Sequence, residues 1–89
     1  MRIEKLGDDV FKVTISGLTK TEHKVTVTDN HHKRLTAGQV TKERLLEFSF
    51  KFLLNREPNT SILASFDITV IQNYFQEYEA EVKRWCDGL

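Results

Sequence analysis

Alternating hydrophobic and polar residues in the first third of the chain predict a small antiparallel sheet. Residues 10–16 and 23–29 each show this period of two, which gives a strand one buried side and one solvent-facing side. A turn at Ser16-Gly17 would join these strands as a hairpin. Because a lone hairpin is marginally stable, residues 2–6 are predicted to add a third strand. The residues that would face the core are Phe11, Val13, Ile15, Val25 and Val27.

From residue 41 onwards the hydrophobic spacing is typical of helices. Thr41 is a typical N-cap, and the segment from there to Asn55 is hydrophobic on almost every side, with one narrow polar stripe. This pattern favours a buried central helix, while the alternation of three phenylalanines within it also fits a strand. Pro58 should end the helix because proline cannot donate a backbone hydrogen bond. Residues 30–40 are polar and are predicted as a connection that can include one helical turn.

The last third of the chain predicts further helices. Residues 61–66 fit a helix of one or two turns, and Asp67 is expected to cap the helix after it. Hydrophobic residues then recur at three- and four-residue steps, and Gly88 should end the pattern. The stripe fits one helix, or two helices with a break near Gln76. Its members are Ile68, Ile71, Phe75, Tyr78, Val82 and Trp85.

These elements predict one α+β domain over residues 1–89. An N-terminal antiparallel sheet of about three strands, in residues 1–29, would be covered on one face by three to four helices in residues 41–86. The 89 residues are 39% hydrophobic and 29% charged, a composition typical of a soluble globular protein. No run is long and hydrophobic enough to cross a membrane, and the single cysteine cannot form an intrachain disulfide. A cytoplasmic protein without membrane contact is therefore expected.

Charge changes sign along the chain although the net charge is zero. Residues 1–44 hold nine Lys or Arg and six Asp or Glu, whereas residues 45–89 hold four and seven. A neutral chain does not favour nucleic acid as its main partner, since phosphate binding depends on cationic contacts. A local basic face is still predicted on the outward side of the hairpin. The candidate nucleic-acid contacts are Lys12, Lys24, Lys33 and Arg34.

No group of residues indicates catalysis, a cofactor or a metal site. The three histidines at positions 23, 31 and 32 lack the spacing of metal ligands and are predicted to be solvated. Cys86 lies near the chain end, where a base and an oxyanion hole would be hard to assemble. The isolated glycines do not form a phosphate-binding loop. We therefore predict a protein without enzymatic activity.

Three segments in the second half of the chain carry a resemblance to a known family. They are Phe52 to Glu57, the triplet Ser61-Ile62-Leu63, and Phe66 to Glu79. The chain resembles a family of small bacterial proteins of unknown function, mainly over residues 41–82. In that family proline usually follows Tyr-Phe, whereas this chain has Gln76. The resemblance implies a bacterial, single-domain protein and assigns no catalytic or binding residue.

The function that these patterns favour is a small protein-interaction or regulatory module, whose partner would be another protein or a second copy. The helix from Phe48 to Leu54 is hydrophobic enough to need extensive cover, which a second copy or the monomer itself would supply. The alternative is a weak nucleic-acid binder that uses the basic face of the sheet. The two differ in salt response, because phosphate binding falls steeply as salt rises.

Overall fold

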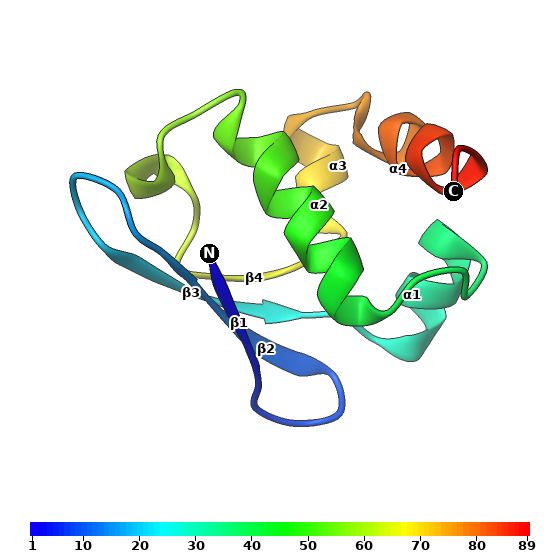
Figure 1. Ribbon diagram of the computed structural model, residues 1–89, viewed down its shortest axis with the longest axis horizontal. Helices are drawn as coiled ribbons and strands as arrows, with labels where there is room; N and C mark the ends of the chain where they lie inside the picture. Colours follow the sequence, from blue (N-terminus) through cyan, green and yellow to red (C-terminus); the bar gives the residue numbers. More distant parts are fainter.

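Three consecutive strands form the antiparallel part of the sheet. The computed structural model describes all 89 residues, and it confirms the predicted hairpin and the additional N-terminal strand (Figure 1). The backbone N–H groups of Leu6 and Gly7 donate to the carbonyl of Val10, which closes the first turn. The three strands are β1 (Arg2–Lys5), β2 (Val10–Ile15) and β3 (Thr21–Thr26).

A fourth strand, β4 (Ser65–Asp67), lies parallel to β3 and makes the sheet mixed, with the order β1-β2-β3-β4. The prediction of a helix over residues 61–66 is wrong. A short 3-10 helix, η1 (Asn59–Ser61), ends there and the chain continues extended. The reason is that β3 offers unpaired backbone groups on its outer edge. Lys24 N–H donates to the carbonyl of Ala64 and Ile68 N–H donates to that of Thr26, so tertiary pairing overrides local preference.

Four α-helices cover one face of the sheet, as predicted (Figure 1). The Thr41 hydroxyl accepts from the N–H of Arg44 at 3.1 Å, which confirms the cap of the central helix. The predicted single turn after the sheet is a longer helix, which Thr28 caps. The helices are α1 (Asp29–Thr36), α2 (Lys42–Leu54), α3 (Val70–Tyr74) and α4 (Tyr78–Asp87).

The C-terminal hydrophobic stripe forms two helices, although no proline separates them. Phe75 has an extended backbone, with φ −134° and ψ 95°, and ends α3. The Gln72 amide donates to the carbonyl of Gln76 and accepts from the N–H of Glu79, so one side chain bridges the break. Asp67 does not cap a helix as predicted. Its carboxylate accepts from the N–H and hydroxyl of Thr69, which makes a turn before α3.

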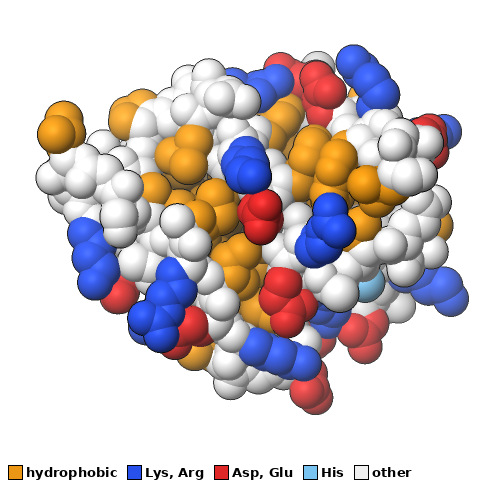
Figure 2. All heavy atoms as spheres, in the orientation of Figure 1, with side chains coloured by type: hydrophobic (Ala, Val, Ile, Leu, Met, Phe, Trp, Pro, Cys, Tyr) orange, Lys and Arg blue, Asp and Glu red, His pale blue; other side chains and the backbone are white.

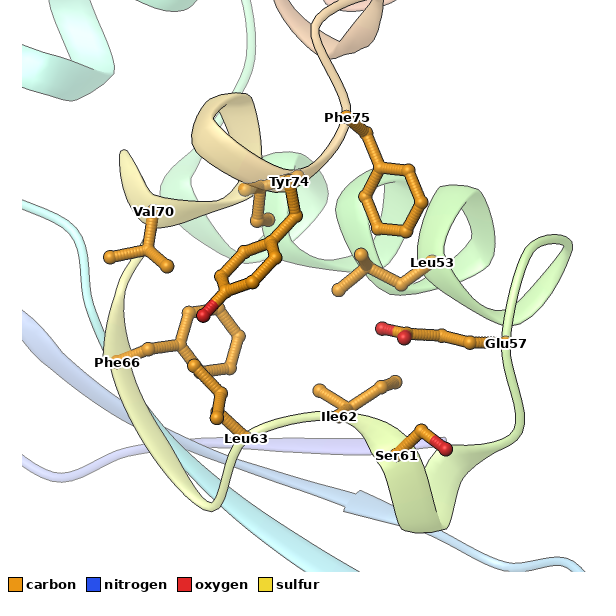
Figure 3. A pocket seen from close by; sticks show the side chains of 10 residues that line it. Leu53, Glu57, Ser61, Ile62, Leu63, Phe66, Val70, Tyr74 and Phe75 are labelled. Carbon is orange, nitrogen blue, oxygen red and sulfur yellow. The ribbon is translucent and has the colours of Figure 1, made fainter.

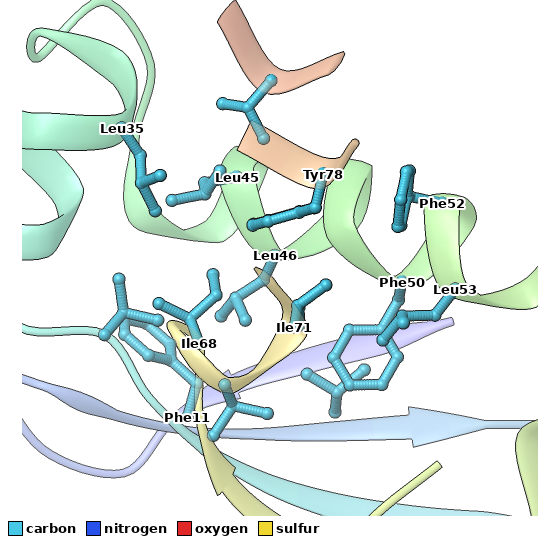
Figure 4. Packing of buried hydrophobic residues seen from close by; sticks show 14 of the residues in the cluster. Phe11, Leu35, Leu45, Leu46, Phe50, Phe52, Leu53, Ile68, Ile71 and Tyr78 are labelled. Carbon is cyan, nitrogen blue, oxygen red and sulfur yellow. The ribbon is translucent and has the colours of Figure 1, made fainter. Parts of the chain in front are cut away.

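Helix α2 packs its hydrophobic side chains between the sheet and the other helices (Figure 4). Phe50 is fully buried, and Phe48 at the other side of the helix stacks on Trp85 with ring centroids 4.5 Å apart. The monomer therefore covers most of this helix itself. Cover by a second copy was the other alternative that the sequence left open. The buried residues on the sheet include the five predicted ones, Phe11, Val13, Ile15, Val25 and Val27.

Histidine 23 corrects another expectation, because it is buried rather than solvated. Its side chain is only 2% exposed, and its ring lies 5.4 Å from that of Phe50. Nδ1 is 2.8 Å from the carbonyl oxygen of Leu63, and Nε2 is 2.8 Å from the hydroxyl of Thr21. A carbonyl only accepts, so Nδ1 carries a proton and donates to Leu63, while Nε2 bonds to the hydroxyl of Thr21. His23 thus joins β3 to the segment before β4.

A buried hydroxyl chain links α2 to α4. The Ser49 hydroxyl donates to the carbonyl of Leu45 at 2.7 Å and lies 2.6 Å from the hydroxyl of Tyr78. Because the single Ser49 proton is used, Tyr78 is the donor to Ser49. Burial raises the pKa of Tyr78 against the opposing effect of this hydrogen bond. Tyr78 therefore stays protonated and able to donate.

Removing either hydroxyl should have unequal effects on stability. Tyr78→Phe removes the hydroxyl that donates to Ser49 and leaves the bond from Ser49 to Leu45 in place. It should lower the free energy of unfolding by about 1 kcal/mol, the usual value of one hydrogen bond. Ser49→Ala leaves the buried Tyr78 hydroxyl without a partner and should cost more, about 2 kcal/mol. Urea denaturation of both variants measures the order. A larger loss in Tyr78→Phe would contradict the assigned direction of the hydrogen bonds.

Candidate functional site

A hydrophobic groove opens beside α3, between the C-terminal end of α2 and the segment from η1 to β4 (Figure 3). Its cavity volume is about 190 Å³. We call it the α3 groove. It is lined by Leu53, Glu57, Ser61, Ile62, Leu63, Phe66, Val70, Ile71, Tyr74 and Phe75, eight of which are hydrophobic.

Hydrogen bonds from the β2–β3 hairpin hold the outer wall of the α3 groove. The Asn59 amide donates to the carbonyl of Thr19 at 2.8 Å and to the hydroxyl of Thr21 at 2.9 Å, which fixes η1 against the hairpin. The His23 bond to the Leu63 carbonyl fixes the next part of the wall. Residues of the hairpin therefore position this wall, so the shape of the groove depends on the sheet.

The rim of the α3 groove leaves large hydrophobic side chains in solvent. Tyr74 is 67% exposed and Leu63 is 46% exposed, while Ile62 and Ile71 form a buried floor. Side chains of Tyr74, Leu63 and Phe66 lie on the same side of the opening (Figure 3). Hydrophobic surface that continues from a depression to its exposed rim is typical of an interaction site.

One charged residue, Glu57, lines the groove. Its half-buried side chain points from the turn after α2 into the opening (Figure 3), and its carboxylate forms no ion pair or hydrogen bond within the chain. The neighbouring Arg56 is engaged elsewhere. Its guanidinium stacks 3.5 Å from the centroid of the Phe52 ring, donates to the Phe52 carbonyl and lies 3.5 Å from Glu77. Glu57 therefore presents a free negative charge beside a hydrophobic surface.

The cations predicted to contact nucleic acid do not form one basic surface. Lys12 lies between Glu4 and Glu22, with its Nζ 3.9 Å from a carboxylate oxygen of each. Lys24 is exposed and pairs across the strands with Lys12 in the sheet register. The outward face of the sheet thus carries both signs of charge.

The remaining two predicted contacts, Lys33 and Arg34, lie on α1 rather than on the sheet. Arg34 donates to Glu79 of α4 at 3.0 Å, so its charge is paired within the helical layer. Thr14, which the alternation of β2 places on the same face as Lys12, is only 9% exposed because strands flank β2 on both sides. Figure 2 shows basic and acidic side chains interspersed on the visible face of the molecule.

The other reactive side chains stay apart. Cys86 is buried in the core, and burial raises the pKa of its thiol, which disfavours the nucleophilic thiolate. Nδ1 of His31 lies 3.7 Å from a carboxylate oxygen of Asp67, without a hydrogen bond. His32 bonds to the carbonyl of Val40. No three His, Cys, Asp or Glu side chains gather as a metal site would require.

Sequence reasoning missed the α3 groove, since it treated residues 61–66 as a helix. One signal was present. Val70 and Tyr74 are hydrophobic residues that lie off the stripe Ile68, Ile71, Phe75. They therefore give this segment a second hydrophobic side that does not face the core.

In comparisons with known proteins, no family model, curated protein or solved structure matches the chain. None of the helices is long and hydrophobic enough to span a membrane.

Proposed function

We propose that the protein is a protein-interaction module that holds a hydrophobic side chain of its partner in the α3 groove. The observation that carries the proposal is the continuity between a hydrophobic depression, the exposed rim residues Tyr74 and Leu63, and the unpaired carboxylate of Glu57. A buried anchor surrounded by a partly polar rim is the arrangement that dominates protein binding energies.

The size and chemistry of the groove favour a protein partner over a small metabolite. Sites for small molecules usually enclose about 300–1,000 Å³, with several polar groups that fix orientation. The α3 groove has about 190 Å³, which suits one large side chain of a partner. Its polar groups are the carboxylate of Glu57 and the hydroxyls of Ser61 and Tyr74.

The charge of the groove supports a protein rather than a nucleic acid. Glu57 is the one charged residue in its lining, and a carboxylate would repel phosphates. On the sheet, Glu4 and Glu22 beside Lys12 reduce the attraction for phosphates that the sequence suggested. A partner with a hydrophobic residue close to a Lys or Arg would match both features of the groove.

Selection of peptides from a random display library on immobilised protein tests the proposal. The expected binders share a large hydrophobic residue with a Lys or Arg a few positions away. Single-stranded oligonucleotides offered in parallel at physiological salt should not bind. Peptides without any shared hydrophobic residue, or oligonucleotides retained in place of peptides, would count against the groove.

Tyr74→Asp should weaken binding of the selected peptides at least about tenfold, because it places a charge at the rim of the hydrophobic groove. Tyr74 is mostly exposed, so the fold should remain intact. Isothermal titration of both proteins measures the change. Leu6→Asp is the matched control, since Leu6 is 54% exposed after β1 and lines no part of the groove. Equal losses in both variants would place the binding site elsewhere.

A further inference from the structure

The turn between β2 and β3 presents a leucine entirely to solvent. Leu18 is not covered by its own chain and is the most exposed of the large hydrophobic residues. Hydrophobic atoms protrude at the end of the molecule in Figure 2 where Figure 1 places this turn. An exposed leucine at the tip of a hairpin does not stabilise the monomer, since a leucine side chain contributes to stability only when it is buried away from water.

The same turn carries a cation two residues from the leucine. Lys20 forms no ion pair within the chain, although Lys12 on the neighbouring strand pairs with two acidic residues. The sequence Leu18-Thr19-Lys20 thus combines a hydrophobic anchor with a free positive charge. These are the two features that the hydrophobic walls and the Glu57 carboxylate of the α3 groove would recognise.

The hairpin tip and the groove lie close together on the molecule. Asn59 of η1 donates to the carbonyl of Thr19 in the tip, and Ser61 at the end of η1 lines the groove. When an anchor and its pocket are neighbours on one surface, a two-fold axis lets two copies exchange anchors reciprocally. Each copy then fills the groove of the other. Both anchors and both grooves are occupied, so the assembly stops at a dimer.

We propose that the occupant of the α3 groove is the β2–β3 turn of a second copy, with Leu18 in the groove and Lys20 paired with Glu57. This proposal rests on the proposed function, because it assigns a partner to the same groove. The dimer is isologous, so each leucine and each ion pair occurs twice.

Sedimentation equilibrium over a range of protein concentrations tests the anchor. The wild-type chain should change from monomer to dimer as its concentration rises. Leu18→Ser should weaken the dimer at least about tenfold, because two anchors are lost. Leu6→Ser is the matched control and should leave the dimer unchanged, since Leu6 is exposed at a different turn. Equal unfolding midpoints, measured at a concentration where the wild-type chain is monomeric, would show that neither substitution disturbs the fold.

Charge exchange tests the ion pair. Lys20→Glu and Glu57→Lys each place like charges at both contacts of a dimer, and each should weaken self-association several-fold at low salt. In an equimolar mixture, the introduced glutamate of one variant would face the introduced lysine of the other, which restores opposite charges with the positions exchanged. The second contact of the mixed dimer keeps the original Lys20 and Glu57. The mixture should therefore form mixed dimers about as well as the wild type.

The outcomes separate this proposal from the proposed function. A wild-type chain that stays monomeric, a dimer that survives Leu18→Ser, or charge variants that fail to complement each other would overturn the second copy as occupant. If the display peptides still bind and lose affinity in Tyr74→Asp, the groove remains a protein-binding site for a different partner. If the peptides fail as well, both proposals fall.

Discussion

Phe50→Asp is expected to unfold the domain. Phe50 is fully buried in α2, where its ring lies 5.4 Å from that of His23 and 6.1 Å from that of Phe66. Truncation of a buried phenylalanine costs about 3–5 kcal/mol, and a buried carboxylate without a partner adds several more. Small domains have a total free energy of unfolding of about 5–15 kcal/mol, so the combined loss removes most or all of it.

Circular dichroism and an amide NMR spectrum would detect the unfolding. Glu47→Asp on the same helix is the matched control, because it introduces the same residue at an exposed position and keeps the charge. Its free energy of unfolding should change by less than about 1 kcal/mol. A well-dispersed, native-like spectrum for Phe50→Asp would contradict the central position of α2 in the core.

His23→Leu should lower the free energy of unfolding by about 2–4 kcal/mol. Leucine fills much of the space, but the carbonyl of Leu63 loses its donor, and an unsatisfied buried group costs about 1–3 kcal/mol. The Thr21 hydroxyl keeps only its bond from Asn59, and the contact of the His23 ring with Phe50 is lost as well. Since Leu63 forms part of the wall of the α3 groove, peptide binding should weaken several-fold under conditions where the variant is folded.

Urea denaturation and peptide titration at neutral pH measure both effects of His23→Leu. His31→Leu is the control, because Nδ1 of His31 makes no hydrogen bond and its side chain is about one third exposed. It should cost less than about 1 kcal/mol and leave peptide binding unchanged. Similar losses of stability in the two variants would contradict the contribution of the His23 hydrogen bonds to the fold. Unchanged peptide binding in folded His23→Leu would show that these bonds do not support the wall of the groove.

The elements with a clear hydrophobic period were predictable from the sequence. The hairpin follows from alternation at Phe11, Val13 and Ile15, and α2 follows from the Thr41 cap and its hydrophobic surface. Strand β4 was not predictable in this way. Its three residues form a strand because β3 provides a hydrogen-bonding edge some forty residues earlier in the chain, and local spacing contains no trace of that edge.

The candidate site was hidden for the same reason. Leu63 comes to the groove through the carbonyl bond to His23, and Phe66 through the pairing of β4 with β3. The expected basic face does not form for a similar reason, because other elements bring acidic residues next to its cations. Acidic partners for Lys12 come from β1 and β3, and the partner of Arg34 comes from α4. Counting charges along one segment does not reveal neighbours that only the fold supplies.

Affinity capture at physiological salt, with and without nuclease, tests the central claim that the α3 groove binds protein. Tagged wild-type protein and tagged Tyr74→Asp would be incubated with lysate of the source cells, and retained protein and nucleic acid would both be identified. The account predicts a defined protein, another one or the untagged chain itself, that the wild type retains despite nuclease and Tyr74→Asp does not. Retained nucleic acid, or the same proteins on both forms, would contradict it.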